Sequence, residues 1–112
     1  MNRDRSEMYA LCFAQCLPSL KRIAQENGYA LGVHGSMRTD LDLIACPWTD
    51  EVSEPEVLIE AIRSRISGVI FEEDSHPTKK PHGRLAWRIH PHGTTWSTRS
   101  IYFDISVVPK GV

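Results

Sequence analysis

The sequence predicts a single α+β domain over residues 1–112, with a mixed β-sheet of about four to five strands flanked by helices. A chain of 112 residues is long enough for one domain with its own core, and too short for two. The composition, 41% hydrophobic and 24% charged, is typical of a folded globular protein. Segments of helical spacing and short apolar runs follow one another in the order α-β-β-α-β-β-β.

Two segments have the spacing of helices. The first begins at Ser6 and ends at Gly28, and Pro18 predicts a kink, or a break at which a new helix starts. The second begins at the sequence Ser53–Glu56, which reads as a capping box with Pro55 in the first turn, and it ends at Gly68.

Five runs have the composition of strands and are bounded by turn residues. They are Tyr29 to His34, Asp40 to Cys46, Val69 to Phe71, Gly83 to His90 and Ser100 to Val108. Two polar loops, Glu72 to His82 and Pro91 to Thr98, lie between the later runs.

Charge and cysteine usage limit the partners and the compartment. The 13 Lys and Arg nearly balance the 14 Asp and Glu, so a polyanion would have to bind a local patch. Cys12, Cys16 and Cys46 are odd in number and lack the spacing of a zinc site, which favours a reduced, cytoplasmic protein. No apolar run approaches the roughly 20 residues that span a bilayer, and we expect no membrane association.

The most informative residues are two aspartates in the second predicted strand. Asp40 and Asp42 are spaced i, i+2, so in a strand their carboxylates lie on one face while Leu41 and Leu43 enter the core. Adjacent carboxylates repel each other unless a cation neutralises them, which predicts a site for Mg²⁺ or Mn²⁺.

Three further groups could complete such a site. Gly35 and Ser36 form a turn just before the aspartates. Asp104 lies on the polar side of the last predicted strand, so it could join the pair across the sheet. Lys80 and Arg84 belong to a basic loop that could contact phosphates.

This arrangement resembles the polymerase-beta-like nucleotidyltransferases, in particular the minimal version of that fold. The resemblance covers most of the chain and rests on Gly35-Ser36, on Asp40 and Asp42, and on Asp104. It implies that Gly35 and Ser36 hold the triphosphate of an NTP, with Lys80 and Arg84 in support. It implies that the aspartates bind two metal ions and that Asp104 is the third carboxylate or the general base.

The implied activity is transfer of a nucleoside monophosphate from the NTP to an unidentified acceptor. A one-domain member lacks the helical domain that usually holds the acceptor, so a homodimer or a protein partner would supply that surface. Only Met37, Arg38 and Thr39 separate the Gly-Ser turn from Asp40, which is fewer residues than the family usually has.

Other interpretations of the same residues stay open. The fold could serve a non-catalytic binding or inhibitory module, of phage or mobile-element type, that engages a protein or a nucleic acid. Asp40 and Asp42 could lie on a solvent face with no function. A weaker alternative is a zinc hydrolase built on histidines, namely His76, His82, His90 and His92.

Overall fold

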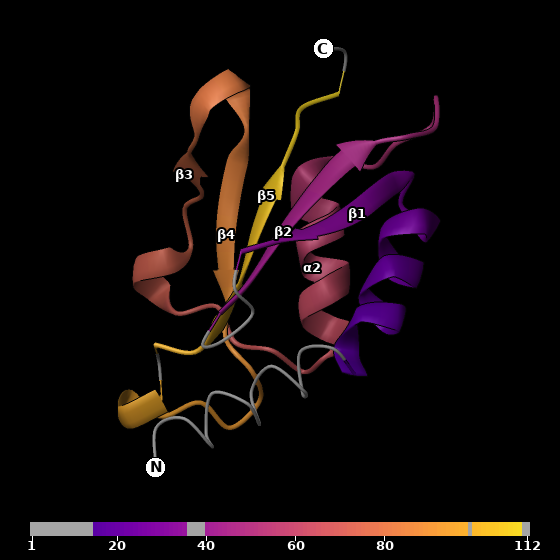
Figure 1. The fold of residues 1–112 in the computed structure, drawn as a ribbon. Coiled ribbons are helices and arrows are strands. Elements are labelled where there is room, and N and C mark those ends of the chain that lie inside the picture. The colour runs from indigo at the N-terminus through magenta and orange to yellow at the C-terminus, as the bar shows by residue number, and fades with distance from the viewer. Residues whose placement is uncertain (1–14, 36–39, 99, 111–112) are drawn as a thin grey trace.

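A computed structural model describes residues 15–35, 40–98 and 100–110, and its centre is a five-stranded mixed sheet (Figure 1). The strands are β1 (Tyr29–His34), β2 (Asp40–Pro47), β3 (Thr78–Lys79), β4 (Leu85–Ile89) and β5 (Tyr102–Val107). Their spatial order is β1-β2-β5-β4-β3. The central pair β2 and β5 is parallel, and the other three pairs are antiparallel. The predicted fold class is confirmed.

Two helices cover one face of this sheet. They are the helix of residues 15–26 and α2 (Pro55–Arg65). Leu20 and Ile23 from the first helix, and Leu58 and Ile62 from α2, are buried in a single hydrophobic cluster with strand residues. Because both helices share this cluster, they lie on the same side of the sheet.

Strict alternation along β2 and β5 gives the sheet two different faces. Every second residue is buried in the core, namely Leu41, Leu43 and Ala45 on β2, and Phe103, Ile105 and Val107 on β5. The residues between them point to the other side, because successive side chains of a strand alternate. We call this other side the open face.

Residues 15–26 form one helical run that includes Pro18, so of the two predicted alternatives the break at Pro18 is excluded. The start of α2 differs from the prediction. The capping box is wrong, because the N-cap of α2 is Glu54 and it makes no side-chain cap hydrogen bond. The carbonyl of Ser53 instead accepts a hydrogen bond of 2.6 Å from the Tyr29 hydroxyl, which ties the start of α2 to β1. Pro55 does occupy the first turn, as predicted.

The third predicted strand is also wrong. Residues 69–71 make one isolated bridge, in which Val69 and His90 exchange two backbone hydrogen bonds. The chain then enters a short 3-10 turn, Glu72–Asp74, which prevents further pairing. The edge strand β3 lies within the segment that the sequence predicts as a polar loop.

The remaining strands lie where they are predicted, with ends that differ by up to two residues. Neither helix in the described part of the chain has the length and hydropathy of a membrane span.

Candidate functional site

Four charged or ionisable residues form a row across the open face. Asp42 on β2 is the register partner of Asp104 on β5. His34 on β1 pairs with Asp42, and Arg88 on β4 pairs with Asp104. Since neighbouring strands lie about 4.8 Å apart and partners share a face, these residues are adjacent in one line. The two aspartate-bearing strands are therefore neighbours, with both carboxylates on one face.

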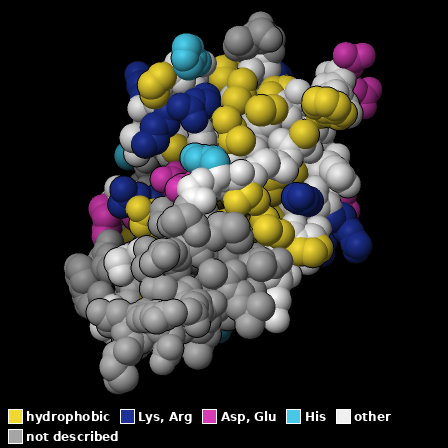
Figure 2. Space-filling model, viewed as in Figure 1, with side chains coloured by type: hydrophobic (Ala, Val, Ile, Leu, Met, Phe, Trp, Pro, Cys, Tyr) yellow, Lys and Arg dark blue, Asp and Glu magenta, His cyan; other side chains and the backbone are white. Residues whose placement is uncertain are grey.

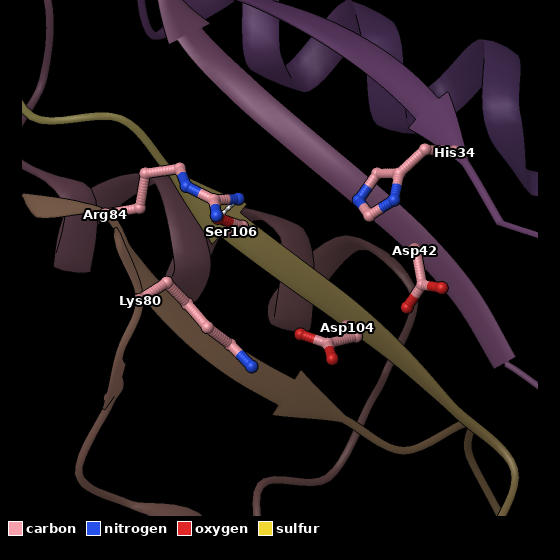
Figure 3. A pocket seen from close by; sticks show the side chains of 6 residues that line it. All are labelled: His34, Asp42, Lys80, Arg84, Asp104 and Ser106. Carbon is pink, nitrogen blue, oxygen red and sulfur yellow. Dashed lines mark hydrogen bonds between the residues drawn. The ribbon is translucent and has the colours of Figure 1, made fainter. Parts of the chain in front are cut away.

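A pocket of about 260 Å³ opens over the two carboxylates. Figure 3 shows His34, Asp42 and Asp104 on one side of it and Lys80 and Arg84 on the other. Ser106 completes the lining, two residues beyond Asp104 on the same face of β5. The pocket therefore combines two carboxylates, two cationic side chains and an imidazole.

Gly35 is placed directly against Asp42. Its φ is +87°, a left-handed conformation that glycine adopts without strain. A Cβ atom at this position would lie 2.5 Å from the Asp42 Oδ2 atom. Only glycine lets the backbone approach the carboxylate this closely, so Gly35 and Asp42 form one local unit.

Lys80 and Arg84 are held by a tight turn between β3 and β4. The backbone N–H of Lys80 donates to the carbonyl of Arg84 at 2.9 Å, and His82 and Gly83 between them have positive φ values. The Arg84 guanidinium donates to the Pro81 carbonyl and to Ser106 Oγ, both at 3.1 Å. These bonds fix the half-buried guanidinium at the pocket wall, whereas Lys80 reaches in from an exposed position (Figure 3).

Arg88, the fourth member of the row, has a different role from the pocket residues. Its guanidinium carbon lies 4.7 Å from the centre of the Tyr102 ring, which is a cation–π geometry. Arg88 and Tyr102 therefore border the site on the β4 side without lining the pocket.

Five of the predicted site residues come together in this region: Gly35, Asp42, Lys80, Arg84 and Asp104. Two others lie outside what the structure describes, namely Ser36 as a whole and the side chain of Asp40. The backbone of Asp40 begins β2, in register with Tyr102.

Sequence reasoning did not assign His34 or Ser106 to the site. The alternation of residues along the predicted strands could have indicated both. His34 ends β1, directly before the Gly-Ser turn, and Ser106 has the same parity as Asp104. What the sequence could not supply was the strand order that makes both residues neighbours of Asp42 and Asp104.

The histidines of the zinc alternative have unlike environments. His76, His82 and His92 are exposed, whereas His90 is buried between the rings of Phe71 and Tyr102. The Nε2 atom of His90 lies 3.6 Å from a carboxylate oxygen of Asp74. His90 is thus a buried residue just beyond the end of β4. Among the described residues it forms no metal-binding group with the other three histidines.

The chemistry of the pocket fits a hard divalent cation that arrives with a phosphate ligand. Over residues 15–35, 40–98 and 100–110, no group of three or more His, Cys, Asp and Glu side chains is arranged to hold a metal ion. Mg²⁺ is commonly held by one or two carboxylates plus substrate phosphates rather than by a complete protein cage. Asp42 and Asp104 are two carboxylates in this pocket, and Lys80 and Arg84 lie on its other side.

A comparison of the chain with protein-family models finds no match, and a comparison with curated proteins finds none either. The functional argument therefore rests on the geometry of this pocket.

Proposed function

We propose that this protein is a metal-dependent nucleotidyltransferase of the polymerase-beta-like type, which transfers a nucleoside monophosphate from an NTP to a hydroxyl group of an acceptor. The observation that carries the proposal is the register of Asp42 and Asp104 on the two central strands, beneath a pocket with a cationic wall. Asp42 and Asp104 would hold Mg²⁺ or Mn²⁺, and the bound cation would offset phosphate charge as a Lewis acid.

In this proposal the phosphates lie between the carboxylates and the cationic wall. Arg84 is suited to this role because its hydrogen bonds to Pro81 and Ser106 fix it before a ligand binds. A guanidinium that is already held loses less conformational freedom when it binds a phosphate. Lys80 adds an exposed positive charge, and the backbone at Gly35 lies next to Asp42, where the turn would contact the triphosphate.

The proposed transfer needs no reactant other than the NTP and the acceptor. The acceptor oxygen attacks the α-phosphorus, the bond from that phosphorus to the bridging oxygen breaks, and pyrophosphate leaves. The hydroxyl proton passes to a carboxylate, for which Asp104 is our choice, because it stands between Asp42 and the cationic wall.

The decisive test is binding of NTP in the presence of metal, followed by pyrophosphate release. We expect Mg²⁺ plus NTP to raise the melting temperature more than Mg²⁺ alone, since the phosphates complete the metal's ligand set. Asp104→Asn should remove this gain. Glu26→Gln, which changes an exposed carboxylate on the helix of residues 15–26, is the matched control and should keep it.

A second measurement separates the enzyme from the binding module. Titration of NTPs and of short oligonucleotides across a salt series should show salt-dependent affinity for NTP that the Lys80→Ala/Arg84→Ala double variant weakens. If the parent protein binds neither ligand with metal present, the catalytic proposal fails. The non-catalytic module that engages a protein would then be the better interpretation.

A further inference from the structure

The open face is apolar at the end where β1 begins and β2 ends. No helix in the described part of the chain covers this end. Ala30 and Cys46 are register partners on β1 and β2, and Ile44 lies between β1 and β5 on the same face. Val108 follows the core residue Val107, so it also points to this side. All four are half-buried, and none belongs to or packs against the core cluster. We call Ala30, Ile44, Cys46 and Val108 the apolar strip.

The sequence of β2 is that of a strand covered on both sides. Its four residues 43–46 are all apolar, without the polar alternation seen at Asp40 and Asp42. Continuous apolar runs are typical of parallel strands that are buried on both faces. The helices cover one face of β2, and the apolar strip lies on its other face.

A loop tied to Gly28 by backbone hydrogen bonds presents Trp48 beside the strip. Trp48 follows β2 and is 79% exposed. Its backbone N–H donates to the Gly28 carbonyl at 2.8 Å, which continues the ladder of β1 and β2 by one residue and places Trp48 on the side of Cys46. Gly28 has φ of +87°, and a Cβ there would lie 2.5 Å from the carbonyl oxygen of Glu51, so the loop packs tightly against it.

The charges on the two sides of the apolar strip are opposite. Asp50 and Glu51, in the loop that carries Trp48, are exposed. The sequence has no Lys, Arg or His between Thr39 and Arg63. Lys110, two residues beyond Val108, pairs with Glu54 at 2.6 Å and offsets that carboxylate, so the acidic charge of this flank is that of Asp50 and Glu51. The other flank carries Lys80 and Arg84. Figure 2 shows this order across the face: basic side chains at the upper left, the hydrophobic patch in the middle and acidic side chains at the upper right.

We propose that the apolar strip packs against the same strip of a second copy of this chain. In a two-fold dimer formed face to face, the axis lies in the plane of the interface. If the axis also runs perpendicular to the line from the basic to the acidic flank, each flank meets the opposite flank of the other copy. Asp50 and Glu51 of one copy then lie near Lys80 and Arg84 of the other, and Trp48 closes both edges.

A second copy is favoured over other partners because the same surface carries both the basic and the acidic flank that would pair across the interface. A polynucleotide would meet the carboxylates of the acidic flank and no cation along the strip. An isologous interface needs a patch that is complementary to itself. A surface with a basic flank, an apolar centre and an acidic flank meets this requirement. This inference goes beyond the proposed function and is tested without nucleotide. It assigns Lys80 and Arg84 to the acidic flank of the second copy, so the dimer and a bound phosphate would compete for these two side chains.

The test is sedimentation equilibrium of the whole chain over a wide concentration range, without nucleotide. We expect a monomer–dimer equilibrium that Trp48→Ala weakens by about tenfold or more, the size expected when a large aromatic is removed from an interface. Trp48 is mostly exposed in the single chain, so its removal should leave the fold intact. The matched control is Val57→Ala, which removes a 53% exposed apolar side chain from α2, on the other side of the sheet.

A charge reversal tests the predicted register of the two copies. Asp50→Lys/Glu51→Lys should weaken the dimer, and adding Lys80→Glu should recover most of the loss, because the reversed charges again lie opposite each other. The proposal is overturned if the chain stays monomeric up to high concentration. It is equally overturned if a dimer forms that responds alike to Trp48→Ala and Val57→Ala, or if the reversal is not rescued.

Discussion

The two faces of the sheet are built from alternate residues of the same strands, yet they differ in almost every physical property. On the covered face, Leu43 and Ile105 are fully buried register partners in the core. One residue earlier on each strand, Asp42 and Asp104 are the register partners beneath the pocket. A shift of one residue in either strand would exchange the two sets. The fold therefore fixes the candidate site through the same register that fixes the core.

This contrast separates stability from function within a distance of one residue. Apolar burial on the covered face holds the strands in place, and the polar open face depends on that placement. Substitutions on the covered face should thus lower the free energy of unfolding strongly, whereas substitutions in the pocket should affect ligand binding with little change in stability.

The largest effect is expected for Leu43→Ala. Leu43 is fully buried in the cluster that both helices share, so its truncation leaves a cavity as well as removing apolar contacts. We expect a loss of about 2–5 kcal/mol in the free energy of unfolding. Ile44→Ala, the next residue on the half-buried open face, should cost clearly less. Urea denaturation of both variants at low protein concentration measures the difference, and equal losses would contradict the assignment of the two faces.

Gly35→Ala comes next. The positive φ strains any residue with a Cβ, and the added atom would also displace the Asp42 carboxylate. We expect a loss of about 1–3 kcal/mol in stability. NTP binding should fall as well, because the carboxylate moves.

The double variant Gly35→Ala/Asp42→Ala divides this cost between its two causes. The contact between the new Cβ and the carboxylate is absent there, so the remaining loss is that of the backbone conformation. If the double variant loses the full sum of the two single losses, Gly35 and Asp42 are not coupled.

Much of this architecture follows from local sequence. The period of two in Tyr102 to Val107 predicted both the strand and the polar side of Asp104. The acidic turn at Glu72–Asp74 and the two-residue strand β3 could not be predicted, because such short pairing is decided by tertiary contacts rather than by propensity.

The site was predictable to the extent that parity determines it. Parity gave the faces of Asp42 and Asp104, but it says nothing of which strands are neighbours, and so His34 and Ser106 were not assigned. The capping box failed for a related reason. The carbonyl of Ser53 is engaged by the Tyr29 hydroxyl of a distant strand, and the helix begins one residue later.

A smaller effect on stability is expected from Tyr29 on the covered face, because only its hydroxyl group is changed in the test. The side chain is buried, and its hydroxyl donates to the Ser53 carbonyl. Burial, followed by the nearby carboxylates of Glu54 and Glu56, raises the pKa of the Tyr29 phenol above its ordinary value of about 10. The folded state therefore holds this proton more tightly than the unfolded state does.

The sign of the pH dependence follows from that difference. The contribution of Tyr29 is complete below about pH 10 and is lost as the pH rises through the higher pKa of the folded state. Tyr29→Phe should cost about 1 kcal/mol at neutral pH through the lost hydrogen bond. It should also make the loss of stability above pH 10 less steep than in the parent. Parallel curves for parent and variant between pH 8 and 11 would contradict the cause assigned to the pKa.

Asp104→Asn should have the smallest effect on stability, and in the opposite direction. Asp104 and Asp42 are register partners on neighbouring parallel strands, and like charges that face each other across a sheet destabilise it. Lys80 and Arg84 on the facing wall offset part of this repulsion, so we expect a gain below about 0.5 kcal/mol in metal-free buffer. Salt should reduce the gain, because the pocket is open to solvent and its charges are screened. Urea denaturation at low and high salt, with a chelator present, measures it. A loss of more than about 1 kcal/mol would mean that Asp104 is needed for the fold itself, and the separation between the two faces would fail at the residue on which the proposed chemistry depends most.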